Sequence, residues 1–241
     1  MKKILFLGLG HLGTFFISQN KGHEIIGTNR SGESDFEIPI ISYQLGARWD
    51  GPRKFDIIII SFPPTQEYAE NLKILLSDLK PFQKIIFVSS TSVFGNGMVS
   101  ELSPQTGQTR NAQELIECES LIKSFNNHVI IRPGGLIDEH RHPRRFFENR
   151  THIKKSKTQV NLVHTYDVAS FIHFAIDQGI TNEDFNLICD DHPTKEEFYG
   201  SFHHHLDYDS QGSETRILSN RKSKEFGFEY KFSTLEWTQH S

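Results

Sequence analysis

Short apolar runs and amphipathic segments alternate along the first half of the chain. Five runs have the length of a strand, and most are almost unbroken in apolar and β-branched residues, as in parallel strands buried on both faces; they span residues 2–7, 24–28, 55–62, 84–89 and 128–132. A shorter run over 38–43 predicts one more strand. Apolar positions at helical spacing follow Gly13, Thr65 and Arg110. This alternation predicts an α/β fold with a doubly wound parallel sheet of the Rossmann type.

The second half contains similar segments at less regular spacing. It predicts two strands and two helices: strands over 161–163 and 184–189, a helix that begins at Thr165 or Asp167, and a helix that begins with the capping-box pattern of Thr194 and Glu197. We therefore divide the chain into a dinucleotide-binding core, residues 1–135, and a mixed region, residues 136–241, that completes the fold and forms a small lid over the substrate.

The turn after the first strand is rich in glycine. Gly8-Leu9-Gly10-His11-Leu12-Gly13 follows residues 2–7 directly and opens a helix. In this context the first glycine allows a tight turn, the second lets the backbone approach a pyrophosphate, and the third lets the helix pack closely on the strand. Free N–H groups at the start of the helix can then hold the phosphates. We predict that Gly8, Gly10, His11, Leu12 and Gly13 bind a dinucleotide.

The second strand ends in Asn29-Arg30-Ser31, at the place where a dinucleotide-binding protein reads the ribose. An acidic residue here would hydrogen-bond the ribose hydroxyls of NAD and repel a 2′-phosphate. Arg30 instead offers a planar cationic fork and Ser31 a small donor, which suits the additional phosphate of NADP. These residues predict a site that prefers NADP, with NAD as the alternative cofactor.

Other strands also end in small, proline or hydroxyl residues. The strand over 55–62 ends at Phe62 and Pro63, the next buried strand ends at Ser89, and the strand over 128–132 is followed by Pro133. Ligands of doubly wound sheets bind beyond the carboxyl ends of the strands. We therefore expect one cofactor to contact all of these ends.

The composition indicates a soluble, enzyme-like domain. The chain has 241 residues and a net charge of −4, with 26 basic and 30 acidic residues, so nothing suggests nucleic acid or an anionic membrane surface as a partner. No apolar run is long enough to cross a membrane, and no signal peptide precedes the first strand. The two cysteines make no disulfide framework. We expect a cytoplasmic monomer or homodimer that binds a small-molecule substrate.

Two basic segments carry less specific information. The loop over 140–145 (HRHPRR) is equally suited to an anionic substrate and to solvent. His203-His204-His205 resembles a metal-binding tract, but consecutive helical residues point in different directions, so a solvated helix face is the better interpretation. We predict no metal site.

Three further segments are Ser89 to Gly95 (SSTSVFG) after a buried strand, Arg132 to Ile137 (RPGGLI) and Val163 to Ala169 (VHTYDVA). They are similar to the S-S-x-x-V-Y-G, R-P-x-x-x-x and V-H-V-x-D-V-A segments of the extended short-chain dehydrogenase/reductases, the NAD-dependent epimerase/dehydratase family. The resemblance runs from the first residue to about residue 230. It implies that the first half binds NAD(P) and that the C-terminal part builds a substrate lid, often for sugar nucleotides.

The resemblance also implies a catalytic arrangement that this chain does not keep. In the family a tyrosine acts as base, a lysine four residues later lowers its pKa, and a serine or threonine hydrogen-bonds the reacting oxygen. The match assigns the serine to Ser90. If Glu119 matches the acidic residue that follows the lysine, Asn111 takes the tyrosine position and Leu115 the lysine position. Together with the altered glycine spacing, this resembles the atypical branch of the superfamily.

Two functions therefore remain open. The first is an NADP-dependent oxidoreductase or epimerase that acts on a small polar or sugar-nucleotide-like substrate, with Ser90 and a base other than tyrosine. His164 titrates in the useful range and lies near the expected cleft, although a packed histidine before a helix is the better interpretation. The second is a catalytically idle NADP-binding sensor or interaction module. A methyltransferase also uses a G-x-G-x-x-G, but Arg30 and the Ser90 segment argue against it.

Overall fold

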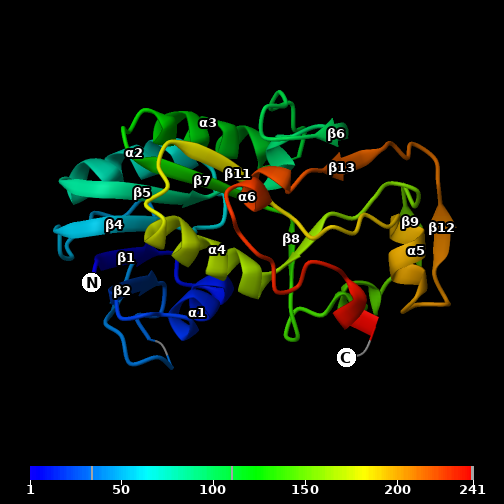
Figure 1. Cartoon of the computed structure of the whole chain (residues 1–241), viewed down its shortest axis with the longest axis horizontal. Coiled ribbons are helices and arrows are strands. Elements are labelled where there is room, and N and C mark those ends of the chain that lie inside the picture. Colours follow the sequence, from blue (N-terminus) through cyan, green and yellow to red (C-terminus); the bar gives the residue numbers. More distant parts are fainter. Residues whose placement is uncertain (34, 110, 240–241) are drawn as a thin grey trace.

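A parallel sheet of seven strands forms the centre of the computed structural model, which describes residues 1–33, 35–109 and 111–239. Its strands are β1 (Lys3–Leu7), β2 (Glu24–Asn29), β3 (Ile40–Ser42), β4 (Phe55–Ile60), β5 (Phe82–Val88), β7 (His128–Pro133) and β11 (Glu183–Leu187). They lie in the order β11-β7-β5-β4-β1-β2-β3 (Figure 1). The order reverses between β1 and β4, which opens a crevice at the carboxyl ends of these strands. The predicted doubly wound fold is confirmed.

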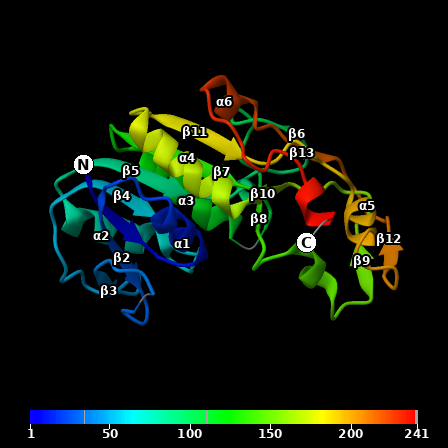
Figure 2. The same cartoon turned by 60° about the horizontal axis from the view of Figure 1, so that its bottom comes forward.

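Two pairs of helices cover the two faces of the sheet (Figures 1 and 2). The helices α1 (His11–Ser18) and α4 (Thr165–Asp177) pack together on one face, and α2 (Tyr68–Leu79) and α3 (Ala112–Lys123) pack together on the other. Successive residues of a strand point to opposite faces. Ile4 and Phe6 therefore join the core beneath α1 and α4, whereas Leu5 and Leu7 join the core beneath α2 and α3. This two-sided burial explains the unbroken apolar runs in the sequence.

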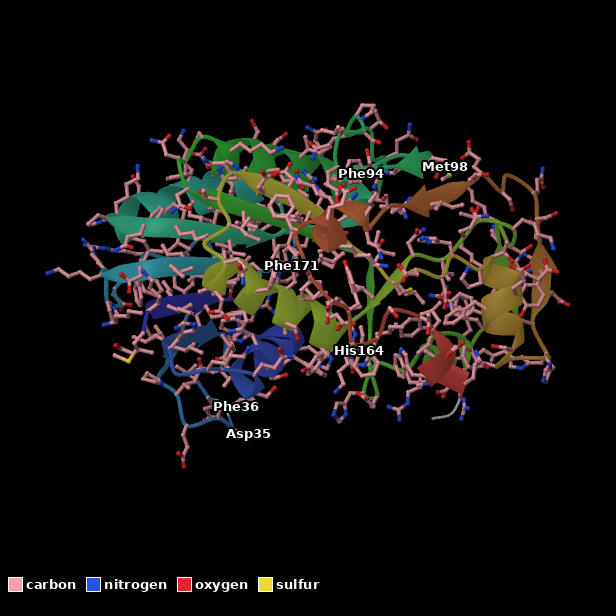
Figure 3. All side chains as sticks on the ribbon, viewed as in Figure 1. Asp35, Phe36, Phe94, Met98, His164 and Phe171 are labelled. Atoms are coloured by element: carbon pink, nitrogen blue, oxygen red, sulfur yellow. The ribbon has the colours of Figure 1, made fainter. Side chains whose placement is uncertain are left out.

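Segments beyond residue 135 are part of the same core. Phe171 of α4, marked in Figure 3, is fully buried, and its ring centroid lies 4.8 Å from that of Phe185 on β11 and 5.0 Å from that of Phe228. Since β11 pairs with β7, the second half of the chain supplies both an edge strand and a covering helix. The sheet is therefore complete only when residues 165–187 are in place.

A smaller region of short elements extends from the carboxyl ends of the central strands (Figure 1). Its paired strands are β6 (Gly97–Val99) with β13 (Arg216–Leu218), β8 (Gly135–Ile137) with β10 (Leu162–His164), and β9 (His152–Lys154) with β12 (Asp207–Asp209). Its helical turns are η1 (Thr91–Val93), η2 (Pro143–Phe147), α5 (Lys195–Gly200) and η3 (Glu236–Gln239). We call this region the lid. The short helix α6 (Arg221–Glu225) packs instead against β11 of the central sheet. Within the described residues, no helix is both long and apolar enough to cross a membrane.

The start of α2 differs from the prediction. Thr65 does not cap the helix, because Glu67 takes a left-handed conformation (φ 56°) and α2 begins only at Tyr68. The capping box before α5 is confirmed: the Thr194 hydroxyl accepts the N–H of Glu197, and the Glu197 carboxylate accepts the N–H of Thr194.

The start of α4 also differs from the prediction. Neither Thr165 nor Asp167 caps this helix; His164 does, with its Nδ1 accepting the N–H of Tyr166 at 3.0 Å. The reason is that His164 is the last residue with an extended backbone (ψ 133°), so its side chain faces the free N–H groups of the first turn. For α3, the predicted start at Arg110 lies outside the described residues, and the helix runs from Ala112.

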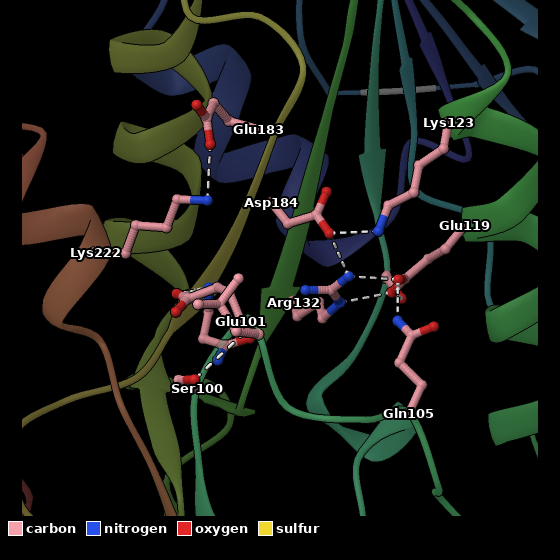
Figure 4. A network of polar contacts seen from close by, with 12 residues as sticks. Ser100, Glu101, Gln105, Glu119, Lys123, Arg132, Glu183, Asp184 and Lys222 are labelled. Atoms are coloured by element: carbon pink, nitrogen blue, oxygen red, sulfur yellow. Dashed lines mark hydrogen bonds and ion pairs between the residues drawn. The ribbon is translucent and has the colours of Figure 1, made fainter.

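A buried arginine connects three elements of the central domain (Figure 4). Arg132 of β7 is 1% exposed and donates from Nε and Nη2 to the carboxylate of Glu119 on α3, at 2.8 and 2.6 Å. Its Nη2 also lies 2.7 Å from Oδ2 of Asp184 on β11, which in turn pairs with Lys123 at 2.6 Å. The Ser89 hydroxyl donates to Glu119 at 2.6 Å. The network therefore supports the segment that leaves β5.

Removing the arginine from this network should destabilise the fold. We expect Arg132→Met to lower the free energy of unfolding by about 3–5 kcal/mol, because Glu119 would remain buried without its cation. Lys123→Met is the matched control, since that lysine side chain is 45% exposed and its pair with Asp184 is worth about 1 kcal/mol or less. Urea unfolding of both variants measures the difference, and equal losses would contradict it.

Candidate functional site

The three glycines of the first turn have three different environments. Gly8 has φ +78°, and a Cβ added there would lie 2.9 Å from atoms of Ser61 and Phe62. A Cβ on Gly13 would lie 2.7 Å from Cδ1 of Leu9, so this position holds the helix close to the strand. At Gly10, by contrast, the nearest atom to an added Cβ is the Gly8 oxygen at 3.9 Å. The backbone at Gly10 therefore faces open space, where a ligand can approach it.

A cavity of about 490 Å³ lies between the glycine turn and the end of β2. Its lining residues are Gly8, Leu9, Gly10, Asn29, Arg30, Tyr43, Gln44, Leu45, Phe62, Pro63, Thr65, Gln66 and Asn71. We call it the first cavity. The side chain of Asn29 closes the turn beside it, since its Oδ1 accepts the N–H of Gly32 at 2.7 Å. Ser31 donates its hydroxyl to the same oxygen at 3.2 Å and does not line the cavity.

A second cavity, of about 410 Å³, continues from the first. The two share Gly8, Gly10, Phe62 and Pro63. The second is also lined by His11, Leu12, Ser61, Pro64, Val88, Ser89, Ser90, Leu115, Pro133, Gly134, Leu136 and Arg141. The two cavities thus bring together every residue predicted to contact the cofactor except Gly13, which packs against the strand, and Ser31.

His11 is held at the edge of the second cavity by a buried carboxylate. Its Nε2 lies 2.6 Å from Oδ2 of Asp138, which is 0% exposed. The other oxygen of Asp138 accepts the N–H groups of His140 and Arg141, each at 3.0 Å. Burial alone would raise the pKa of Asp138, but hydrogen bonds from Thr165 and His11 hold it below its usual value. The carboxylate is therefore charged at neutral pH and fixes the imidazole ring.

A third cavity, of about 870 Å³, lies between the central domain and the lid. Ser90 and Gly134 line both this cavity and the second one. The other lining residues are Thr91, Ser92, Phe94, Gly95, Asn96, Thr106, Gln108, Thr109, Gly135, Lys155, Asn161, Glu214 and Arg216. The three cavities form one cleft along the carboxyl edge of the sheet, from Arg30 to Arg216.

Ser90 lies at the junction of the second and third cavities. Its hydroxyl caps η1 by accepting the N–H of Ser92 at 3.1 Å, which leaves the hydroxyl proton free to donate. Leu115 also lines the second cavity, as expected from its place on α3. Asn111 does not accompany it, because it is exposed, stands just before the helix and lines none of the three cavities.

His164 is separated from the cleft by packing. This residue, labelled in Figure 3, is 2% exposed. Its ring stacks on Phe232 at a centroid distance of 3.7 Å, and Trp237 lies edge-on at 4.9 Å. Burial lowers its pKa, although the carboxylate of Glu139 opposes this. His164 lines none of the three cavities. Tyr166 lines a separate cavity beside Ser18, so it does not approach Ser90 in the cleft.

The two basic segments also take defined places. Of the loop over 140–145, Arg141 lines the second cavity. The three consecutive histidines follow α5 instead of lying on it, and Nε2 of His203 lies 2.6 Å from the Arg144 carbonyl oxygen. Across the described ranges, no three metal-ligating side chains gather in a way that could hold an ion.

Sequence reasoning missed the residues that come from the lid. Lys155 and Arg216 line the third cavity, but the sequence around each resembles that of an ordinary surface strand or turn. For Asp138 the sequence gives a weak indication of a role in the site, because this residue directly follows the R-P segment, whose last three residues form β8.

Comparisons with known proteins place this geometry in a structural class. No family model matches the chain. Protein YeeZ of Escherichia coli is 29% identical to it, over 96% of this chain and 97% of YeeZ.

Solved structures match over nearly the whole chain. A short-chain dehydrogenase/reductase superfamily protein from Agrobacterium tumefaciens, with bound NAD, has a TM-score of 0.81 at 15% identity, covering 99% of this chain and 95% of that one. The dTDP-glucose 4,6-dehydratase of Bacillus anthracis, in complex with NAD, has a TM-score of 0.78 at 14% identity, covering 100% and 95%. Human epimerase family protein SDR39U1, with NADPH, has a TM-score of 0.73 at 14% identity, covering 99% and 98%.

The chain therefore has the fold of the short-chain dehydrogenase/reductases and of their epimerase/dehydratase members. This confirms, at the level of the fold, the resemblance noted in the sequence.

The different environments of the glycines lead to a test by stability. Gly13→Val should lower the free energy of unfolding by about 1–3 kcal/mol, because its side chain would overlap Leu9. Gly10→Val should cost less stability, because its side chain enters open space from an extended backbone and only the preference for glycine over valine at this N-cap is lost. Chemical denaturation of the two variants would contradict this assignment if Gly10→Val lost as much stability as Gly13→Val.

Proposed function

We propose that this protein is an NADP-binding, atypical member of the short-chain dehydrogenase/reductase superfamily. In this proposal it is an oxidoreductase or epimerase that acts on a small polar or sugar-nucleotide-like substrate. The observation that carries the proposal is the continuous cleft from Arg30, past Gly10, to Ser90. It follows the carboxyl edge of the sheet across the switch point between β1 and β4, where such folds bind dinucleotides.

The residues of the cleft fit a dinucleotide. The open backbone at Gly10 and the N–H groups at the start of α1 would hold the pyrophosphate. Arg30 would hold the 2′-phosphate of NADP at the far end of the first cavity. A bound nicotinamide dinucleotide would supply a hydride donor or acceptor. The three structural neighbours described above carry NAD or NADPH, which supports this cofactor class.

Two of the chain's own side chains could then act on a substrate. The Ser90 hydroxyl can donate a hydrogen bond to a substrate oxygen at the junction of the cavities. With Asp138 accepting from Nε2 of His11, the Nδ1 of that ring is left to take or give a proton. We infer that His11 is a better candidate for the base than His164, because His11 lines the cleft.

One observation favours a catalytically idle NADP-binding sensor as the alternative. The apolar Leu115 lines the second cavity beside Ser89 and Ser90, where the resembling family has its lysine. In the described part of the chain, no tyrosine lines the second or the third cavity.

Cofactor preference tests the first cavity. NADPH should bind more tightly than NADH, and Arg30→Ala should remove most of that preference, about tenfold or more in affinity, because charge-assisted hydrogen bonds to the 2′-phosphate are lost. Calorimetric titration measures both affinities. Gly10→Val, in which the two added methyl groups obstruct the pyrophosphate, should bind neither cofactor. Equal affinity of the unaltered protein for NADPH and NADH would refute the assignment of Arg30.

Turnover separates the enzyme from the sensor. NADPH oxidation should be measured over a panel of carbonyl compounds and sugar nucleotides. With an active substrate, His11→Asn should lower kcat by roughly a hundredfold or more, whereas NADPH binding should fall much less, because the proposed phosphate contact at this position uses the backbone N–H. His164→Asn is the control and should change kcat little, since the asparagine can still cap α4. Tight NADPH binding without turnover of any compound would instead support the sensor.

A further inference from the structure

A half-buried arginine lines the third cavity without an acidic partner. Nη2 of Arg216 donates to the carbonyl oxygen of Thr91 at 2.8 Å. Burial lowers the pKa of Arg216, and in the described part of the chain no carboxylate opposes this shift or forms an ion pair with the guanidinium. Four of its five N–H donors are thus left for other partners. A desolvated cation in this state is stabilised when an anion binds to it.

The position of Arg216 is set by the surrounding backbone. Its N–H donates to Oε1 of Gln159 at 2.9 Å, and its carbonyl oxygen accepts from Nδ2 of Asn161 at 2.8 Å. β13 also pairs with β6, which places Arg216 opposite Gly97. Its contact with Thr91 places the guanidinium next to the turn that begins at Ser90. An anion bound here would therefore lie close to Ser90.

A second cation lines the same cavity. Lys155 takes a left-handed backbone conformation (φ 54°) at the turn after β9, and it forms no ion pair with any described residue. Of the acidic side chains, Glu214 lines the cavity and accepts a hydrogen bond from Asn96. The remaining lining includes the neutral polar side chains of Ser90, Ser92, Thr106, Gln108, Thr109 and Asn161. The cavity is therefore polar, with an excess of one positive charge.

We propose that Arg216 and Lys155 form an anion-binding subsite for the substrate, which thus carries a phosphate or a carboxylate group. The planar guanidinium fork matches either group with two parallel hydrogen bonds, and the ammonium adds a point charge. The proposal rests on the proposed function in one respect: it takes Ser90 to mark the reacting end of the cleft. The bound anion then holds the substrate in the third cavity beside Ser90.

Direct binding of simple anions tests this subsite. The protein is saturated with NADPH, which occupies the phosphate sites of the cofactor cleft, and is then titrated calorimetrically with pyrophosphate or with succinate at constant ionic strength. We expect at least one probe to bind. Arg216→Gln should weaken that probe about tenfold or more, and Lys155→Gln should weaken it less. Arg221→Gln is the matched control, because this side chain is 82% exposed and pairs with Glu225 outside the cavity; it should change nothing.

The two probes distinguish the sources of the anion. Preference for pyrophosphate indicates a phosphate-bearing substrate, and preference for succinate indicates a carboxylate. Binding of neither probe, or equal affinity in the unaltered protein and in Arg216→Gln, would overturn the proposal. So would a probe that Arg221→Gln weakens as much as Arg216→Gln does.

Two further measurements keep the test separate from the proposed function. If the protein binds no NADPH, the proposed cofactor fails. The anion titration is then repeated with Gly10→Val, whose glycine turn is blocked. Loss of probe binding in that variant would place the anion at the turn and not at Arg216.

If Arg216→Gln does not fold, the Nε–H resonance of Arg216 is followed by NMR in the unaltered protein. A shift that saturates with the calorimetric affinity supports the subsite, and an unmoved resonance overturns it.

Discussion

The buried pairing of Arg132 with Glu119 is the interaction on which the site depends. Both side chains are 1% exposed, so neither charge has water to replace its partner. The pair joins β7 to α3 and, through Asp184, to the edge strand β11. Glu119 also accepts the hydroxyl of Ser89, the residue directly before Ser90. The segment that leaves β5 is thus held by the buried charge network through Ser89, while the same segment lines the cleft and remains open to a ligand.

The two ends of the cleft differ in how closely their residues match the resembling family. In the glycine turn, Gly8 and Gly13 leave no space for a side chain, and Gly10 is open where the proposed pyrophosphate would lie. At the other end, an apolar Leu115 occupies a wall where the family has an ammonium group. The polar groups of that end come from elsewhere: a histidine held by Asp138, and two cations from the lid.

The sequence predicts the central sheet well because its information is local. Unbroken apolar runs, turn residues at strand ends and the spacing of the first three glycines each report on their immediate neighbours, and the parallel sheet follows from their alternation. The same reasoning placed Phe62, Ser89 and Pro133 at one edge, where they line a common cavity. His164 shows the limit. A histidine before a helix can cap it or face a cleft, and only the packing of Phe232 and Trp237 against its ring decides between them.

Arg216 and Lys155 could not be found in this way. Each reaches the third cavity through pairings between segments far apart in the chain, β13 with β6 and β12 with β9. No periodicity in the sequence encodes such a pairing, since the strands involved are only three residues long. The altered helix start at Tyr68 has a similar origin, because the N–H of Tyr68 is accepted by Glu114 on α3, a contact with no signal near Thr65.

The pairing of β6 with β13 has a consequence for biosynthesis. During translation, the strands β1 to β5 and β7 can leave the ribosome and pair with one another as each neighbouring strand becomes available. β6 must wait much longer, because its partner at residues 216–218 is made more than a hundred residues later. The nascent protein therefore assembles the wall around Arg30 and Gly10 well before the wall that contains Arg216. In a growing chain, the part of the cleft around Gly10 would thus form before the part that contains the proposed anion subsite.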